Sequence, residues 1–186
     1  MTISPELDER FRAAAVASQL LDVAYDVVDS PIGPLLVATS DAGVCRIEFD
    51  AEPERDEEVL ARAFGARVLR APRAVDRARR ELDEYFEGRR RDFDLELDLR
   101  PVADFHRTVL ERLAEVPYGQ VTTYGTLAAR AGRPRAARAV GTVMNRNPIP
   151  IVLPCHRVIG ASGKLVGYGG GLDRKVALLE LEGATL

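Results

Sequence analysis

A cysteine and a histidine stand side by side in the segment Pro154-Cys155-His156-Arg157, in a chain with only two of each. A thiolate is a strong nucleophile, and a nearby imidazole can take the proton from the thiol. Successive residues of a regular strand point to opposite faces, so Cys155 and His156 can cooperate only if the backbone turns or a water bridges them. Pro154 favours such an irregular start. The alternative is a buried, inert cysteine, and spacing alone leaves the two interpretations about even.

Charge is distributed unevenly along the 186 residues. From Pro101 onward, 11 Lys and Arg stand against six Asp and Glu, a net charge of +5, whereas the first hundred residues carry −8. A basic half suggests contact with a polyanion, although chance clustering would give the same pattern. No apolar run is long enough to span a bilayer, and no signal-peptide pattern is present. These features predict a cytoplasmic protein without membrane contact.

The first hundred residues predict a mixture of helices and strands. Ser4-Pro5 begins a helix that reaches about Leu21. Residues 93–99 alternate apolar and acidic side chains, as a half-exposed strand or an extended linker would. Between them we expect strands at 25–28, 35–39 and 44–49 and helices at 54–64 and 74–87, the last closed by Gly88.

Arg100-Pro101 is the expected domain boundary, and the part beyond it reads as mainly helical. Two of the expected helices, 124–131 and 135–144, are joined by Gly132-Arg133-Pro134 and suggest a helix-turn-helix, a motif that is weak by itself. Asp104 and Thr123 are candidate caps. The other expected helices cover 104–115 and 172–182.

The helix expected at 135–144 combines arginines with small side chains. Arg135, Arg138 and Arg146 can donate charge-assisted hydrogen bonds to phosphates, and small side chains let the backbone approach a ligand closely. The alternative to a DNA-binding or ligand-binding helix is an ordinary helix, in which the alanines have no special role and the arginines face solvent. The small residues are Ala136, Ala137, Ala139 and Gly141.

These motifs follow one another in an order that resembles a known family. From Val116 the chain reads V-P-Y-G-Q-V-T-T-Y-G, then A-A-R-A-V-G, N-R-N-P-I-P-I-V-L-P-C-H-R-V-I-G and G-Y-G-G-G, and it closes on L-L-E-L-E-G. This series resembles the methylated-DNA–protein-cysteine methyltransferases, densely over residues 105–183 and loosely before them. The resemblance implies an α/β (α+β) protein: a small ribonuclease-H-like sheet-and-helix domain over residues 23–100, and a mainly helical domain with a helix-turn-helix over residues 101–186. An extra N-terminal helix in residues 1–22 precedes them.

The resemblance also assigns roles to single residues. Cys155 would be the nucleophile, and Glu182 would orient His156, which would draw the thiol proton through a water. Tyr124 would donate to the leaving purine. Arg138 would fill the space of an extruded base while its helix lies in the minor groove, together with the DNA-binding residues Arg135, Ala137, Ala139 and Gly141.

The remaining implied residues form the pocket and its hinge. Asn147 would tie the helix-turn-helix to the cysteine loop as a structural hinge. A phosphate-binding loop is the alternative interpretation of the glycine-rich stretch at 167–171, but Gly163-Lys164-Leu165 lacks the Ser or Thr that such a loop requires. The resemblance implies no cofactor. A metal site is not expected either, because the sequence contains no C-x-x-C and no H-E-x-x-H spacing. The implied pocket walls are Met144, Val158, Tyr168 and Gly169.

The sequence therefore predicts direct repair of alkylated DNA. Cys155 would take a methyl or larger alkyl group from 6-O-alkylguanine, less readily from 4-O-alkylthymine, after base flipping and in a single turnover. The expected partner is double-stranded DNA containing alkylated bases, and the expected state is a monomer. Two alternatives remain open: a non-catalytic, alkyltransferase-like damage binder and a cysteine hydrolase.

Overall fold

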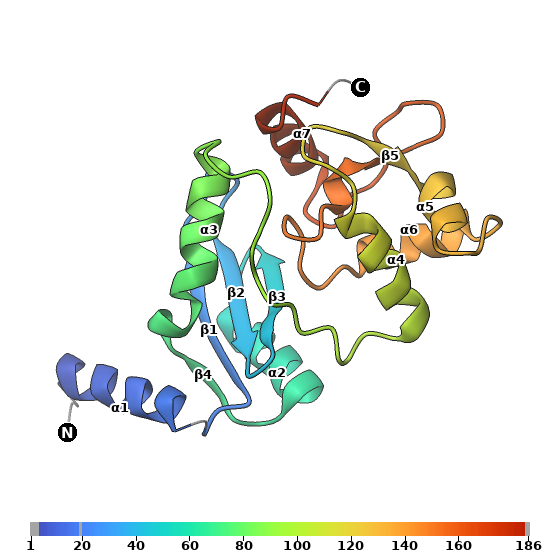
Figure 1. Cartoon of the computed structure of the whole chain (residues 1–186). Helices are drawn as coiled ribbons and strands as arrows, with labels where there is room; N and C mark the ends of the chain where they lie inside the picture. The colour runs from blue at the N-terminus through green and yellow to red at the C-terminus, as the bar shows by residue number, and fades with distance from the viewer. Residues whose placement is uncertain (1–3, 19, 185–186) are drawn as a thin grey trace. The chain divides into compact units, whose positions relative to one another are not determined.

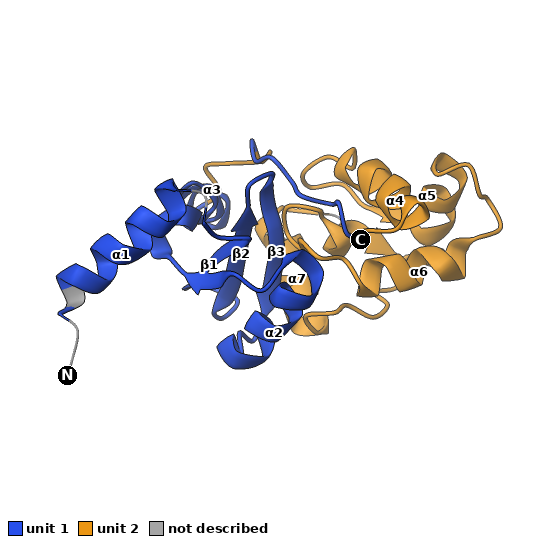
Figure 2. Cartoon of the chain, turned by 90° about the horizontal axis from the view of Figure 1, so that it is seen from below, with its two compact units in different colours: residues 1–87, 94–101 blue, residues 88–93, 102–186 orange. Residues whose placement is uncertain are grey.

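The computed structural model describes residues 4–18 and 20–184 and divides into two compact units (Figure 2). Unit 1 comprises residues 1–87 and 94–101, and unit 2 comprises residues 88–93 and 102–186. Unit 1 holds a small sheet, and unit 2 is mainly helical (Figure 1). This arrangement confirms the predicted mixed α/β class.

Unit 1 is built on a four-stranded sheet with the order β3-β2-β1-β4. The first three strands form an antiparallel meander, and the short β4 joins β1 in parallel. Alternate residues of β1 and β2 point to one face, as the period of a strand requires, and pack there with Cys45 and Leu60. The strands are β1 (Val23–Val28), β2 (Leu35–Ser40), β3 (Gly43–Phe49) and β4 (Val68–Arg70).

The helices of unit 1 follow the predicted ones with shifted ends. Helix α1 (Pro5–Ala17) begins as expected, with the Ser4 side chain accepting from the Leu7 amide at 3.3 Å, but it ends four residues before Leu21. The others are α2 (Pro53–Phe64), α3 (Asp76–Phe86) and the short 3-10 helix η1 (Pro72–Val75). Strand β4 was not predicted, because three residues are too few to show a period.

Residues 93–99 form an extended linker and not a strand of the sheet. Their contact with β3 is an isolated bridge between Val44 and Leu97. The Val44 amide donates to the Glu96 carbonyl at 2.8 Å, and the Asp98 amide donates back to the Val44 carbonyl at 2.8 Å. Gly43 permits this approach, since a Cβ atom there would lie 2.2 Å from the Glu96 carbonyl oxygen. Of the two predicted alternatives, the linker is the one found.

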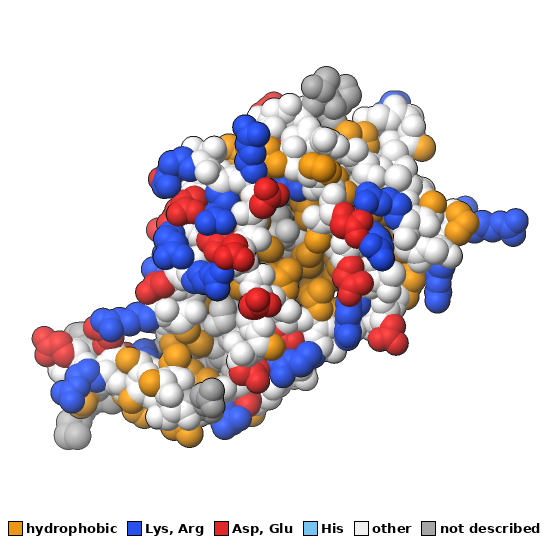
Figure 3. All heavy atoms as spheres, viewed as in Figure 1, with side chains coloured by type: hydrophobic (Ala, Val, Ile, Leu, Met, Phe, Trp, Pro, Cys, Tyr) orange, Lys and Arg blue, Asp and Glu red, His pale blue; other side chains and the backbone are white. Residues whose placement is uncertain are grey.

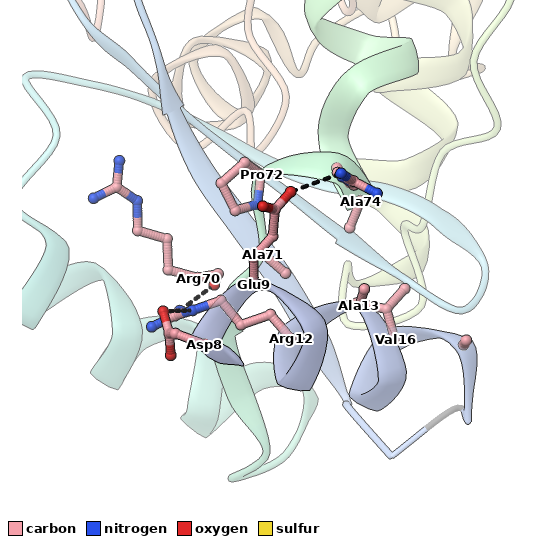
Figure 4. Close-up of a pocket in the computed structure, with 11 residues that line it drawn as sticks. Asp8, Glu9, Arg12, Ala13, Val16, Arg70, Ala71, Pro72 and Ala74 are labelled. Atoms are coloured by element: carbon pink, nitrogen blue, oxygen red, sulfur yellow. Dashed lines mark hydrogen bonds and ion pairs between the residues drawn. The ribbon is translucent and has the colours of Figure 1, made fainter. Parts of the chain in front are cut away.

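Helix α1 borders a groove of about 580 Å³ against the segment from Arg70 to Ala74 (Figure 4). Arg73 pairs with Glu9 at 2.7 Å, and the Arg12 side chain donates to the Arg70 carbonyl. Most of the other lining residues are small and apolar. The charged contacts of Glu9 and Arg12 join helix α1 to the segment from Arg70 to Ala74.

Two buried carboxylates of unit 1 are paired with arginines. Asp26 is buried and binds Arg70 at 2.8 Å and Arg79 at 2.5 Å, and Asp98 binds Arg100 at 2.7 Å. On the face seen in Figure 3, side chains of both signs lie interspersed. Among the described residues, no helix is long and apolar enough to cross a membrane.

Unit 2 packs its helices around buried aliphatic side chains such as Leu113, Leu127 and Val140. Thr123 caps α5, its hydroxyl accepting from the Thr126 amide at 3.1 Å, as predicted. Asp104 does not cap α4, whose N-cap is Ala103. The elements are α4 (Asp104–Ala114), β5 (Thr122–Thr123), α5 (Tyr124–Arg130), α6 (Ala137–Asn145), η2 (Cys155–Arg157), β6 (Val158–Ile159) and α7 (Leu172–Leu181).

Two short strands connect the helix-turn-helix region to the cysteine segment. Strand β5 pairs in parallel with β6, and Thr122 stands opposite Val158. Helix α5 begins directly after β5, and η2 ends directly before β6. Helix α6 begins at Ala137, so Arg135 lies in the turn before it and not on the helix as predicted.

Candidate active site

The cysteine and the histidine lie in a 3-10 turn and not in a strand. The Cys155 amide donates to the Leu153 carbonyl at 2.8 Å, and the Arg157 amide donates to the Pro154 carbonyl at 3.0 Å. The alternation that would separate neighbouring side chains in a strand therefore does not apply. Both side chains are buried: Cys155 is 5% exposed and His156 is 0% exposed.

The loop before Cys155 is held by Asn147. Its side-chain amide donates to the Leu153 carbonyl at 2.7 Å, and its carbonyl oxygen accepts from the Ile149 amide at 3.1 Å. Ile151 lies within this loop with φ of 75°, a left-handed conformation that costs a β-branched residue about 1–2 kcal/mol. The fully buried Ile151 side chain fits the view that packing maintains this conformation.

Glu182 binds both residues that follow the cysteine. Its Oε1 atom lies 2.9 Å from Nε2 of His156. Arg157 donates to the same carboxylate with Nε and Nη2, both at 2.8 Å. The Gly119 amide adds a fourth donor at 3.1 Å. Although burial opposes it, hydrogen bonds from His156 and Arg157 lower the pKa of Glu182 to about 2. The carboxylate is therefore ionised at neutral pH.

This contact determines which nitrogen of His156 can act as a base. An ionised carboxylate only accepts hydrogen bonds, so Nε2 carries the hydrogen and Nδ1 keeps its lone pair. Nδ1 is buried and has no hydrogen-bond partner within the described part of the chain. Burial lowers the pKa of His156, against the opposing effect of Glu182, so the ring is neutral and able to accept a proton.

Cys155 is surrounded by groups that moderate the effect of its burial. Burial raises the pKa of the thiol, whereas the Asn147 amide, the charge of Lys175 and the Tyr168 hydroxyl act in the opposite direction. Lys175 is completely buried, and its ammonium donates to the carbonyls of Val158 at 2.6 Å and Val166 at 3.0 Å. Burial lowers the pKa of Lys175 in turn.

Tyr124 is half-buried at the start of α5. Burial raises the pKa of its hydroxyl, and the charge of Cys155 raises it further, which indicates that the two side chains are near each other. A Cβ atom built on Gly141 would lie 3.9 Å from two carbons of the Tyr124 ring. The small residue on α6 thus leaves room for the aromatic ring of α5.

The remaining predicted residues fall into two groups. Arg135, Arg138 and Ala139 are exposed, while Ala137 and Gly141 are half-buried, so this part of unit 2 presents charge and small side chains to solvent. Met144 and Val158 are buried, Tyr168 is half-buried and Gly169 is exposed. The structure thus brings Asn147, Tyr124 and Tyr168 close to Cys155, and Glu182 binds the adjacent His156.

Sequence reasoning missed two charged residues of this site, Arg157 and Lys175. Arg157 lies inside the quoted P-C-H-R-V motif, and its position between His156 and a run of apolar residues was the available signal for burial. Lys175 lies in α7 one turn after the glycine-rich loop and gave no comparable signal. Within residues 4–18 and 20–184, no group of three His, Cys, Asp or Glu side chains is placed to hold a metal ion.

Comparison with known proteins covers both units. A family model described as the DNA binding domain of 6-O-methylguanine DNA methyltransferase matches residues 104–184, and a model of its ribonuclease-like domain matches residues 23–99. The chain is 44% identical to a methylated-DNA–protein-cysteine methyltransferase of Methanosarcina barkeri, over 85% of this chain and 96% of the relative. It is 47% identical to a methylated-DNA–protein-cysteine methyltransferase of Mycolicibacterium paratuberculosis, over 86% of this chain and 92% of the relative.

A solved structure agrees with these matches. Mycobacterium tuberculosis OGT, crystallised in complex with DNA, superposes with a TM-score of 0.76 and 44% identity, covering 86% of this chain and 92% of that one. The resemblance predicted from the motifs is therefore confirmed. The chain belongs to the methylated-DNA–protein-cysteine methyltransferase family.

Proposed function

We propose that this protein repairs DNA by transferring an alkyl group from a damaged base to Cys155. The observation that carries the proposal is the hydrogen bond between His156 and Glu182, next to a buried cysteine in a chain of this family. The proposed substrate is double-stranded DNA that contains 6-O-alkylguanine, and less readily 4-O-alkylthymine.

The chemistry follows from the site geometry. Nδ1 of His156 takes the thiol proton through a water, and Glu182 stabilises the imidazolium that forms. The Cys155 sulfur then attacks the alkyl carbon, forming a C–S bond while the C–O bond breaks. The electron pair of the broken bond remains on the guanine, which accepts a proton or a hydrogen bond from Tyr124. The thioether that results has no leaving group, so each molecule reacts once.

The DNA is proposed to lie along α6 with its minor groove toward Arg138. An atom inside stacked DNA cannot be reached by a buried thiol, so the alkylated base must be flipped out, at a cost of a few kcal/mol. Arg138 would fill the space left by the base, and Arg135 would neutralise a phosphate. In this scheme residues 101–186 bind DNA and react, residues 23–100 support them, and the protein acts as a monomer.

Labelled DNA tests the proposal directly. Duplex DNA carrying 6-O-methylguanine with a labelled methyl group is incubated with the protein, and the peptide that contains Cys155 is examined by mass spectrometry. We expect one label per protein molecule on Cys155. Label that is released in many turnovers from an unmodified protein would indicate a hydrolase, and binding without transfer would indicate a damage binder.

The second cysteine provides a matched control. Cys45 is buried in the core of unit 1, and burial raises its pKa to about 12. A Cys45→Ala variant should therefore transfer the label as the unmodified protein does, whereas Cys155→Ala should not transfer it. Transfer by Cys155→Ala would defeat the assignment of the nucleophile.

A further inference from the structure

Residues 88–93, here called the arm, are placed unexpectedly in the fold. The arm follows α3 of unit 1 and leads into residues 94–101, which again belong to unit 1, yet its contacts assign it to unit 2 (Figure 2). Gly88 begins it in a left-handed conformation with φ of 71°, and Arg90 donates to the Asp92 carbonyl at 2.9 Å. A segment packed in this way brings its own side chains to unit 2.

Arg91 of the arm lies against Tyr118. The guanidinium carbon is 5.6 Å from the centroid of the Tyr118 ring, within the range of a cation–π interaction. Arg157 lies 5.8 Å from the same centroid. Arg91 is exposed, Tyr118 is half-buried and Arg157 is buried. One aromatic ring therefore interacts with an exposed cation and with a buried cation of the active site.

Tyr118 is also attached to the segment that carries Glu182. Its hydroxyl donates to the Leu181 carbonyl at 3.0 Å, and the next amide, that of Gly119, donates to Glu182 Oε2 at 3.1 Å. Gly119 has φ of 73°, and a Cβ atom there would lie 2.9 Å from the Glu182 carbonyl oxygen. Displacement of Tyr118 would therefore disturb Glu182 through two hydrogen bonds and through Arg157.

We propose that Arg91 is a positioning residue for alkyl transfer, acting through Tyr118 and Arg157 on Glu182 and His156. This inference rests on the proposed function. Arg91 touches no reacting atom, and its effect is to keep the Tyr118 ring against Arg157. Arg157 in turn keeps the Glu182 carboxylate aimed at Nε2 of His156.

The charges around His156 give the proposal a pH signature. Burial lowers the pKa of His156, and the charges of Arg157 and Lys175 lower it further but more weakly. Glu182 raises the pKa of His156, and Cys155 is the adjacent residue in the chain. If Arg157 moves away from Glu182, the imidazole keeps its proton to higher pH. The rising part of the rate-against-pH profile should then shift to higher pH, because transfer needs neutral His156.

The test measures single-turnover transfer at several DNA concentrations. We expect Arg91→Ala to lower the limiting rate constant about two- to five-fold, the size of an exposed cation–π interaction, and to shift the pH profile upward. The DNA concentration for half-maximal rate should not change. Arg91→Lys, which retains the cation, should restore the rate and the profile. Arg10→Ala, an exposed arginine of α1, controls for the loss of one positive charge.

Double variants identify the route. In a Tyr118→Leu background, which lacks the ring, Arg91→Ala should have no further effect, whereas in a Tyr118→Phe background its full effect should remain. An equal effect in both backgrounds, an effect confined to the half-maximal DNA concentration, or no effect at all would overturn the proposal. Failure of the unmodified protein to transfer the label would defeat the proposed function instead, so the two failures are distinguishable.

Discussion

Glu182 is the residue on which the contacts of the candidate active site converge. It accepts hydrogen bonds from His156, from two nitrogens of Arg157 and from the Gly119 amide. A buried carboxylate with several donors gains stability when it is ionised. The same group therefore links the reactivity of the site to the stability of unit 2.

Glu182→Gln should reduce both properties. The neutral amide retains the shape of the side chain but no longer stabilises a positive charge on His156, so we expect transfer to slow by about 10²-fold. The uncompensated buried Arg157 should lower the free energy of unfolding by about 3 kcal/mol. Single-turnover rates and denaturant unfolding measure the two effects. A rate within a factor of two of the unmodified protein would contradict the role of Glu182.

Acid titration gives an independent check of the same residue. The pKa of Glu182 is about 2 in the folded protein against an ordinary value of 4.5, so the folded state favours the ionised form. Its contribution, about 3 kcal/mol, is fully present above pH 4.5 and is lost as the pH falls toward 2. The stability of Glu182→Gln should show less dependence on pH in that window. Urea unfolding at several pH values measures the difference.

Lys175 allows a prediction about the thiol itself. Its charge lowers the pKa of Cys155, against the larger effect of burial. Lys175→Met has a similar length without the charge, so we expect the thiol to react more slowly with iodoacetamide at neutral pH. The reaction is followed in a Cys45→Ala background so that only Cys155 is observed. Circular dichroism controls for the fold, and faster reaction in the Met variant would contradict the prediction.

The site residues that could be predicted from the sequence were those that belong to the recognisable series of motifs. Cys155 and His156 were singled out because they are adjacent, whereas Glu182 was named only through the family resemblance, which relates it to His156, 26 residues earlier. Arg157 and Lys175 were missed, because a charged side chain is normally exposed and its burial depends on partners that only the fold brings near. The contact of Arg91 with Tyr118 could not be predicted for the same reason, since Tyr118 belongs to a distant segment of the chain.

At the scale of elements, long and strongly patterned segments were predictable and short ones were not. Helices α2 to α7 and strands β1 to β3 were expected close to their observed ends. Strands β4, β5 and β6 have three residues or fewer and are defined by pairing alone. The alternation at residues 93–99 was compatible with either a strand or an extended linker. The segment is a linker, because its pairing with β3 is limited to an isolated bridge between Leu97 and Val44.

Helix α1 lies outside the residues matched by either family model, which begin at residue 23. Its attachment rests on the Arg73–Glu9 pair and on Arg12, and exposed pairs contribute little stability. Deletion of residues 1–22 should therefore leave the transfer rate within about two-fold and lower the melting temperature by about 2–4 °C, the equivalent of about 1 kcal/mol. A large loss of transfer at an unchanged melting temperature would show that α1 takes part in the reaction.

At the scale of the whole molecule, charge is divided between the two halves of the chain. The buried carboxylates Asp26 and Asp98 of the first half are paired with arginines, whereas Arg135 and Arg138 are exposed at the start of α6. Such a distribution favours approach of a polyanion to unit 2. The division was readable from the sequence, but the local pairing in unit 1 required the structure.

Salt dependence of DNA binding tests this division. If Arg135 contacts a phosphate, Arg135→Ala should weaken binding equally for damaged and undamaged duplexes and reduce the slope of log affinity against log salt by about 1. Arg138→Ala should instead reduce the preference for alkylated DNA. Fluorescence anisotropy at several salt concentrations measures both. An unchanged slope for Arg135→Ala would remove that residue from the DNA contact.

The depth of Cys155 has a consequence for the lifetime of the unreacted protein. Cys155, which is 5% exposed and whose pKa is raised by burial, encounters dissolved oxidants and small electrophiles rarely and mostly in its protonated form. In the proposed single-turnover reaction each molecule has one thiol to use. Burial would protect that thiol from side reactions until alkylated DNA binds.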